Sequence, residues 1–201
     1  MRVLVVTGGI GSGKSLSCKI LHDEYGWPVY DADSKVKELY LSHPSLLSEI
    51  ENAMGKSLRD PDGNFLPYLL AEIIFSDKQM LETVESLVFP VLMQDFEKWK
   101  LDNERHEVVI LESATVLEKP SLKGLGDFTI LIDAPLSVRM ERAVSRDASS
   151  QEKVLARMNL QTLMNEISSG LVVPQVDALV SNDGDIDLLR TKLQEFVGKV
   201  I

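Results

Sequence analysis

A glycine-rich run near the beginning of the chain has the residue types and spacing of a phosphate-binding loop. Residues 8–15 read GGIGSGKS and match the Walker A pattern G-x-x-x-x-G-K-[ST]. Glycines let backbone N–H groups approach phosphate oxygens, because no Cβ atom stands in the way. The lysine can reach the β- and γ-phosphates of a nucleotide, and the serine hydroxyl can bind Mg²⁺. We expect a nucleoside triphosphate to be bound by Gly9, Ile10, Gly11, Ser12, Gly13, Lys14 and Ser15.

A carboxylate follows the next expected strand. Asp33 comes shortly after the apolar residues 28–30, at the carboxyl end of that strand. In an open α/β sheet this edge faces the ligand crevice. A carboxylate there can accept the proton of an attacking hydroxyl, or orient that hydroxyl and help to hold Mg²⁺. Capping of a helix that starts at Ser34 is the alternative role for Asp33, and Asp31 is expected to be structural.

Two arginines later in the chain have the spacing of neighbours on a helix. Arg142 and Arg146 are four positions apart and share a face, which Arg139 can join. Planar guanidinium groups match phosphate oxygens and the charge that spreads over them during transfer. The alternative is a solvated helix face in which these arginines pair with Glu141 or Asp147.

The elements around these residues predict an α/β fold. A β-branched run at 3–7, the glycine loop, a helix at 14–25 and a strand at 28–30 form a βαβ unit. This context argues against a chance glycine turn at residues 8–15, and it implies a parallel sheet with right-handed crossovers. Further strands are expected at 108–111, 128–132 and 178–180, and further helices at 137–146, 151–165 and 186–197.

The stretch between the second and third expected strands is predicted to be mostly helical. It is too long for a simple crossover, so we expect a side lobe at residues 34–102. Pro90 is expected to bend or break the last helix of this lobe. The expected helices span 34–41, 44–54, 67–75 and 78–99.

The composition of the chain excludes several classes of protein. The chain has 201 residues, 44% of them hydrophobic, so a single domain with a sizeable core is expected. A net charge of -10 argues against a non-specific nucleic-acid binder. One cysteine rules out an intramolecular disulfide framework, and the sequence contains no apolar run of membrane-spanning length. We expect a cytoplasmic protein that binds neither nucleic acid nor membrane; nothing in the sequence specifies its oligomeric state.

The Walker A pattern alone does not separate kinases, GTPases and ATPases. The Asn-Lys-x-Asp motif by which GTPases read the base is absent from the sequence. ATPase motors are normally larger than this chain. A small chain with a helical lobe after its second strand suits a kinase that acts on a small metabolite.

The combination of motifs resembles the dephospho-CoA kinase family. The run TGGIGSGKS at 7–15 is followed by VYDAD at 29–33 and by the pattern R-x-x-x-R-D that ends at Asp147. Members of that family transfer a phosphoryl group from ATP to the ribose 3′-hydroxyl of dephospho-CoA, the last step of coenzyme A synthesis. The likeness covers nearly the whole chain and continues at 73–75, 87–90, 133–147, Arg157, Gln161, Asp177 and 182–184.

The resemblance implies a P-loop NTPase-type three-layer α/β fold with a parallel five-stranded sheet, a helical substrate lobe and a lid. The lobe at 34–102 would hold dephospho-CoA. The lid at 139–173 would close over ATP and exclude water, so that the phosphoryl group goes to the ribose hydroxyl. The core would comprise residues 1–33, 103–138 and 174–201.

The resemblance also implies roles for individual residues. Lys14, Asp33 and Arg142 would be catalytic, and Ser15 and Asp33 would hold Mg²⁺. Nucleotide binding would involve Arg146 together with Asn182, where the family places adenine contacts. A turn residue before Gly184 is the alternative for Asn182.

Three stretches depart from the pattern of that family. This chain has Phe89-Pro90 where His-Pro is usual, and residues 66–69 lack the usual basic side chains. No Lys or Arg occurs between Met158 and Leu189, although a basic residue usually follows soon after the position of Gln161. Two alternatives therefore stay open: another small-molecule or nucleoside kinase of the same fold, and a nucleotide-binding regulatory protein with little turnover.

Overall fold

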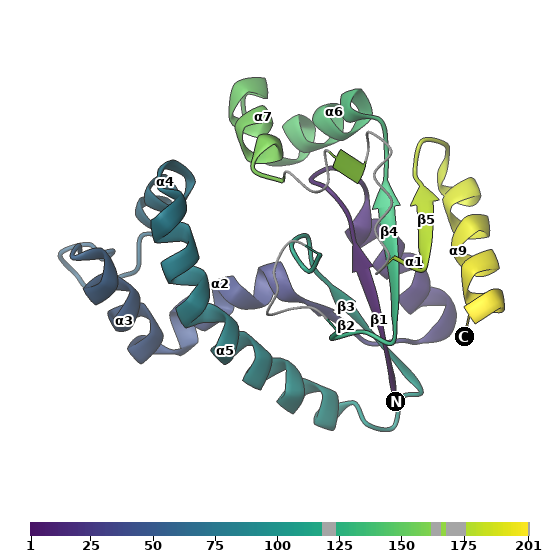
Figure 1. Cartoon of the computed structure of the whole chain (residues 1–201), viewed down its shortest axis with the longest axis horizontal. Coiled ribbons are helices and arrows are strands. Elements are labelled where there is room, and N and C mark those ends of the chain that lie inside the picture. The colour runs from purple at the N-terminus through teal and green to yellow at the C-terminus, as the bar shows by residue number, and fades with distance from the viewer. Residues whose placement is uncertain (118–123, 162–165, 168–175, 201) are drawn as a thin grey trace. The chain divides into compact units, whose positions relative to one another are not determined.

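The computed structural model describes residues 1–117, 124–161, 166–167 and 176–200 (Figure 1). Five strands form one parallel sheet in the order β2-β3-β1-β4-β5, so the predicted five-stranded parallel sheet is confirmed. Every pairing within it is parallel. The strands are β1 (Arg2–Thr7), β2 (Val29–Asp31), β3 (Val108–Glu112), β4 (Phe128–Asp133) and β5 (Ala178–Ser181).

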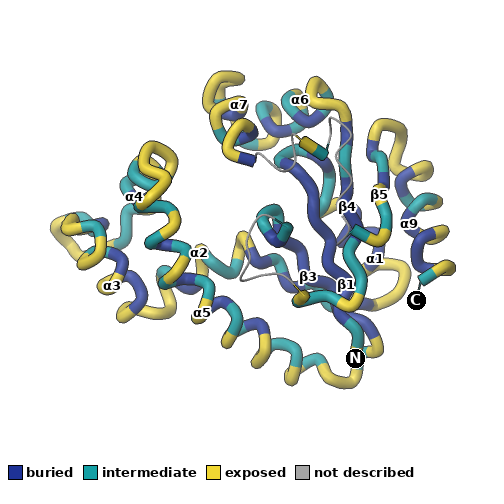
Figure 2. Tube along the Cα trace, in the orientation of Figure 1, coloured by how far each residue is buried: buried dark blue, intermediate teal, exposed yellow. Residues whose placement is uncertain are grey.

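Two helices cover one face of this sheet. The helix α1 (Lys14–Tyr25) follows the glycine run, and α9 (Ile186–Val200) follows β5. Strand β1 lies at the centre and is buried from Val3 to Thr7 (Figure 2), as is usual in parallel sheets covered on both faces. The core on the α1 and α9 side includes Leu4, Val6, Ile110, Ile130, Ile132, Leu21, Leu193 and Phe196.

Polar side chains that could take part in chemistry lie where the strands end. Asp31 and Glu112 are register partners at the ends of β2 and β3. Beyond the end of β4, the chain forms α6 (Leu136–Asp147) and α7 (Gln151–Asn159). Because parallel strands present their carboxyl ends at one edge, the glycine loop and the two carboxylates lie at this edge. Figure 1 shows α6 beyond the end of β4.

Residues Ala32–Asp102 form a second compact unit, separate from the unit made by Met1–Asp31 and Asn103–Ile201. This unit is helical throughout its regular elements. Its longest helix packs through a seam of buried residues at every fourth position, Val84, Val88, Leu92 and Phe96. The helices are α2 (Ala32–Ser42), α3 (Pro44–Met54), α4 (Pro67–Ser76) and α5 (Lys78–Asp102).

Most helix and strand ends lie within three residues of the prediction, and three differences need comment. Helix α5 continues through Pro90 without a break, because the buried seam on both sides of the proline holds its turns in register. Helix α2 begins at Ala32, so Asp33 lies inside its first turn and is not the residue before a helix that starts at Ser34. Helix α7 ends at Asn159 and not at 165, and residues 162–165 lie outside the described part of the chain. No helix among the described residues is both long and apolar enough to cross a membrane.

Candidate active site

The backbone of the glycine run adopts a conformation that other residues rarely reach. Gly8, Gly11 and Gly13 have φ values of 149°, 76° and 102°. Side chains with a Cβ atom are strained at such positive φ angles, whereas glycine is not. The run therefore curls into a loop between β1 and α1, and it does so at the positions where the sequence supplies glycine.

The same run is also packed too closely for side chains. A Cβ atom at Gly9 would lie 2.1 Å from Nη2 of Arg139, and one at Gly11 would lie 2.1 Å from the Arg139 carbonyl oxygen. A Cβ atom at Gly13 would lie 2.1 Å from Nδ2 of Asn182. The loop is thus held against α6 on one side and against the residue after β5 on another.

Hydrogen bonds within the protein already use two of the loop amides. The N–H of Ile10 donates to Oε1 of Gln161 at 2.8 Å, and the N–H of Ser12 donates to the Gly9 carbonyl at 3.1 Å. Ile10 therefore helps to hold the loop. Its N–H group donates to Gln161 and not to the phosphate that the motif suggested as its partner. Gly9, Gly11, Gly13, Lys14 and Ser15 stay the candidates for phosphate binding through their amides, and Lys14 and Ser15 begin helix α1.

A second group of polar side chains lies beside the loop. The Ser15 hydroxyl donates to Oε1 of Glu112 at 2.6 Å. Burial raises the pKa of Glu112, and the negative charge of Asp31 adds to this effect. Burial likewise raises the pKa of the Cys18 thiol well above its ordinary value. Lys14 lies over the loop, with its Nζ 3.5 Å from the Gly9 carbonyl oxygen.

Oxygen ligands at this edge suit a magnesium ion. Mg²⁺ in phosphoryl-transfer sites is usually bound by one or two protein groups together with substrate phosphates and waters. The Ser15 hydroxyl and the Glu112 carboxylate form such a donor set. Among the described residues there is no cluster of three or more His, Cys, Asp and Glu side chains, so a metal cage made by protein alone is not seen there.

The sequence interpretation missed Glu112. It stands at the end of an apolar strand, and its partner Ser15 is 97 positions away in the chain. The rule that identified Asp33, a carboxylate at the carboxyl end of a strand, applies equally to Glu112 and could have found it. Asp33 itself is exposed in the first turn of α2, where a negative charge is favourable.

The three arginines of α6 differ in their surroundings. Arg139 is buried, with a relative exposure of 1%, and its Nε donates to the Ile10 carbonyl at 3.1 Å. Arg142 is half-buried, and its Nη1 donates to the Asn182 carbonyl at 3.1 Å. Arg146 is exposed and forms an ion pair with Asp147 at 2.7 Å.

Asp147 joins the end of α6 to α7. It accepts hydrogen bonds from Arg146 and from Arg157 of α7. These two guanidinium groups lower the pKa of Asp147 to about 2. The pair that Arg146 forms with Asp147 is the alternative to phosphate binding that the sequence offers for this arginine.

Asn182 is buried directly after β5. Its Nδ2 donates to the Ser12 carbonyl at 2.8 Å, and its backbone N–H donates to the Asp133 carbonyl at 2.7 Å. The side chain therefore braces the glycine loop. Neither this role nor that of Gln161 could be read from the sequence, because each contact joins residues more than 150 positions apart.

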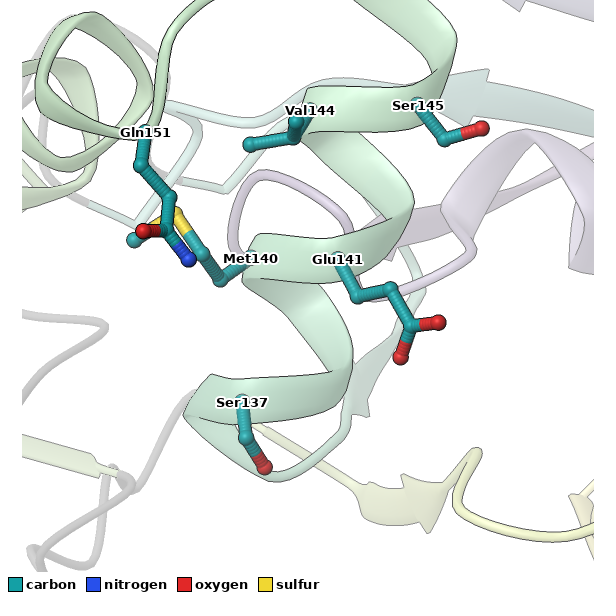
Figure 3. Close-up of a pocket in the computed structure, with 6 residues that line it drawn as sticks. All are labelled: Ser137, Met140, Glu141, Val144, Ser145 and Gln151. Carbon is teal, nitrogen blue, oxygen red and sulfur yellow. The ribbon is translucent and has the colours of Figure 1, made fainter.

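A hollow of about 420 Å³ lies on the other face of α6 (Figure 3). Because a helix turns by 3.6 residues, the residues of α6 that line it point away from Arg139, Arg142 and Arg146. The hollow is therefore separate from the arginine face that meets the glycine loop. It is lined by Ser137, Met140, Glu141, Val144 and Ser145 of α6 and by Gln151 of α7.

Comparison with known proteins extends over nearly the whole chain. A family model described as dephospho-CoA kinase matches residues 2–187. A dephospho-CoA kinase from Porphyromonas gingivalis is 34% identical over 204 residues, which cover 96% of each chain. A crystal structure of a protein from Thermus thermophilus is 26% identical with a TM-score of 0.81, and the match covers 100% of this chain and 98% of the other. A dephospho-CoA kinase from Campylobacter jejuni shares the fold at 21% identity and a TM-score of 0.64, over 98% of this chain and 96% of the other.

Proposed function

This chain belongs to the dephospho-CoA kinase family, and we propose that its glycine loop, Ser15, Glu112 and the arginine face of α6 form the ATP-phosphate site of that enzyme. The reaction transfers a phosphoryl group from ATP to dephospho-CoA and gives coenzyme A and ADP. One observation carries the proposal. The glycine loop, the Ser15–Glu112 pair and two arginines of α6, Arg139 and Arg142, lie at the carboxyl edge of the sheet.

We propose that Lys14, Arg142 and Arg146 act on the transferred phosphoryl group. Lys14 stands at the end of the loop, where the β- and γ-phosphates of a bound nucleotide are expected. Arg142 and Arg146 bring planar guanidinium groups that match phosphate oxygens. Positive charges fixed before the reaction stabilise the charge that develops in the transition state without reorganising solvent.

Asp33 is proposed to accept the proton of the ribose 3′-hydroxyl. It is an exposed carboxylate two residues beyond the end of β2, and its family motif is intact at residues 29–33. A carboxylate that removes or orients this proton makes the hydroxyl oxygen a better nucleophile. Helix α2 fixes the backbone of Asp33, which lies in its first turn.

Ser15 is proposed as a magnesium ligand, with Asp33 as a second ligand from the same family pattern. Glu112 accepts the hydrogen of the Ser15 hydroxyl, which would leave the lone pairs of that oxygen to bind a metal ion. A magnesium ion held by these residues would supply positive charge that neutralises the phosphates of ATP. Asn182 stays the candidate for adenine contact, in addition to its bond to the loop. The cytoplasmic location and the absence of nucleic-acid binding remain predictions.

An ADP-release assay tests the acceptor. The wild-type chain with ATP and Mg²⁺ should release ADP with dephospho-CoA and not with adenosine, AMP or shikimate. The Lys14→Ala variant should fold normally and lose roughly a hundredfold or more in kcat, as when one preorganised donor is removed. Release with another acceptor would favour the alternative kinase. Tight ATP binding without turnover on any of the four would favour a regulatory protein.

A further inference from the structure

Arg139 stands apart from the other arginines of α6 because its charge is buried. Its relative exposure is 1%, and burial lowers the pKa of the guanidinium group. The carboxylate of Asp133 lies 3.7 Å from Nη1 and opposes that shift. Moving a charged side chain out of water costs several kcal/mol in a protein. A buried arginine is therefore expected to have a role whose benefit offsets this cost.

The position of the guanidinium group indicates what that role is. Its Nε donates to the Ile10 carbonyl at 3.1 Å, while Gln161 accepts from the N–H of the same residue at 2.8 Å. Both polar groups of Ile10 are therefore held, one from α6 and one from beyond α7. The Ile10 side chain also packs against the small core shared by α6 and α7, which contains Ala143.

We propose that Arg139 is a positioning residue that fixes the nucleotide-binding conformation of the glycine loop through the Ile10 peptide. The guanidinium group also lies directly against Gly9, where an added Cβ atom would be 2.1 Å from Nη2. Arg139 therefore contacts the loop itself, whereas Arg142 and Arg146 are the arginines proposed above to bind phosphate. The inference rests on the proposed role of the loop in binding ATP phosphates.

The first test is nucleotide affinity, measured by calorimetric titration of the full chain with ATP and with ADP in the presence of Mg²⁺. Arg139→Met should weaken both by about tenfold or more, the effect of losing a charged hydrogen bond that holds the loop. Arg139→Lys should restore affinity only in part, because lysine keeps the charge and lacks the planar fork. The KM for dephospho-CoA should stay unchanged. Arg190→Met, which removes an arginine paired with Glu24 on α1, is the matched control and should leave nucleotide affinity unchanged.

A second test does not depend on how well Arg139→Met folds. Gly9→Ala adds one methyl group that points at the guanidinium, and Gly9 has no positive φ that would itself strain alanine. With Arg139 present, this variant should weaken ATP and ADP binding by about tenfold. With Arg139→Ala, which vacates the contact, the same methyl group should weaken binding by less than about twofold.

Two results would overturn the inference. One is a folded Arg139→Met variant with wild-type affinity for ATP and ADP, which would leave Arg139 as a packing residue. The other is a Gly9→Ala effect of equal size with and without Arg139. A wild-type chain that binds ATP but does not phosphorylate dephospho-CoA would contradict the proposed function instead, since these tests read nucleotide affinity and not turnover.

Discussion

Glu112 is subject to opposing demands at the scale of a single residue. Its carboxylate orients Ser15, yet burial and the nearby charge of Asp31 disfavour its ionised form. A carboxyl group whose pKa is raised in the folded state stabilises the fold at low pH. That contribution is lost as the pH rises from the unfolded value of 4.5 through the raised value. At pH values above this raised pKa, the ionised Glu112 therefore lowers the stability of the protein without ligand.

Glu112→Gln should accordingly raise the melting temperature at pH 7 and lower kcat. The amide oxygen can still accept from Ser15, but the variant carries no charge to support a metal site. The gain in stability should shrink as the pH falls from the raised pKa of folded Glu112 toward 4.5 and should be absent below 4.5, because Glu112 is then protonated in both states of the wild type. Thermal melts from pH 4 to pH 8 and steady-state kinetics measure the two effects.

Glu107→Gln is the control, since Glu107 is an exposed glutamate that pairs with Arg2 on the surface. It should change neither the kcat nor the pH dependence of the melting temperature appreciably. A Glu112→Gln variant with normal turnover would remove Glu112 from the proposed magnesium site.

The role of Asp33 is testable by an almost isosteric change. Asp33→Asn should lower kcat by roughly a hundredfold or more, because an amide cannot accept the proton of the hydroxyl. Affinity for ATP should change much less. The comparison needs steady-state rates with dephospho-CoA and a separate titration with ATP. If the variant turns over at the wild-type rate, Asp33 serves only the first turn of α2.

At the scale of elements, α6 divides its arginines between two tasks. Arg139 is buried against the loop, while Arg142 is half-buried and Arg146 is exposed, and these two are proposed to bind phosphate. No basic residue occurs in the sequence between Met158 and Leu189, so that stretch cannot add to the charge. We therefore expect the loss of Arg142 or Arg146 to lower activity more in this chain than it would in a chain with further basic residues in that stretch.

Arg142→Ala and Arg146→Ala should each lower kcat/KM by roughly a hundredfold. Lysine at either position should rescue activity only in part, because it cannot form the bidentate contact. Arg105→Ala, which removes a basic side chain far along the sequence from α6, is the control and should leave kcat/KM unchanged. Small decreases in kcat/KM for both variants, with rapid turnover of dephospho-CoA, would show that other groups neutralise the phosphate charge.

Sequence reasoning succeeded where the signal is local. The glycine loop is written in eight consecutive residues, and the five strands are apolar runs that can be recognised singly. It failed where partners are distant, since Gln161 reaches Ile10 and Asn182 reaches Ser12 only after the chain has folded. Pro90 is a third case. The local rule predicted a bend or a break there; the break is absent, because long-range packing of the α5 seam keeps the helix continuous.

At the scale of the whole molecule, the chain consists of two compact units. One contains the glycine loop and the sheet, and the other is the helical unit Ala32–Asp102. A ligand that binds only the folded form stabilises it by RT ln(1 + [L]/Kd), about 2.7 kcal/mol at a hundredfold excess over Kd. That free energy protects only those segments whose opening destroys the binding site.

ATP at a hundredfold excess over its Kd should therefore slow amide hydrogen exchange unequally along the chain. Core amides of β1, α1 and β3 that exchange only when their unit unfolds should slow by about a hundredfold. Amides of α3 and α4 should change little if the helical unit opens independently. Lys14→Ala, at the same ATP concentration, should lose most of the protection in β1 and α1, because less of that protein is bound. Equal slowing in both units would instead show that they unfold as one cooperative body, and the binding free energy of ATP would then stabilise the entire chain.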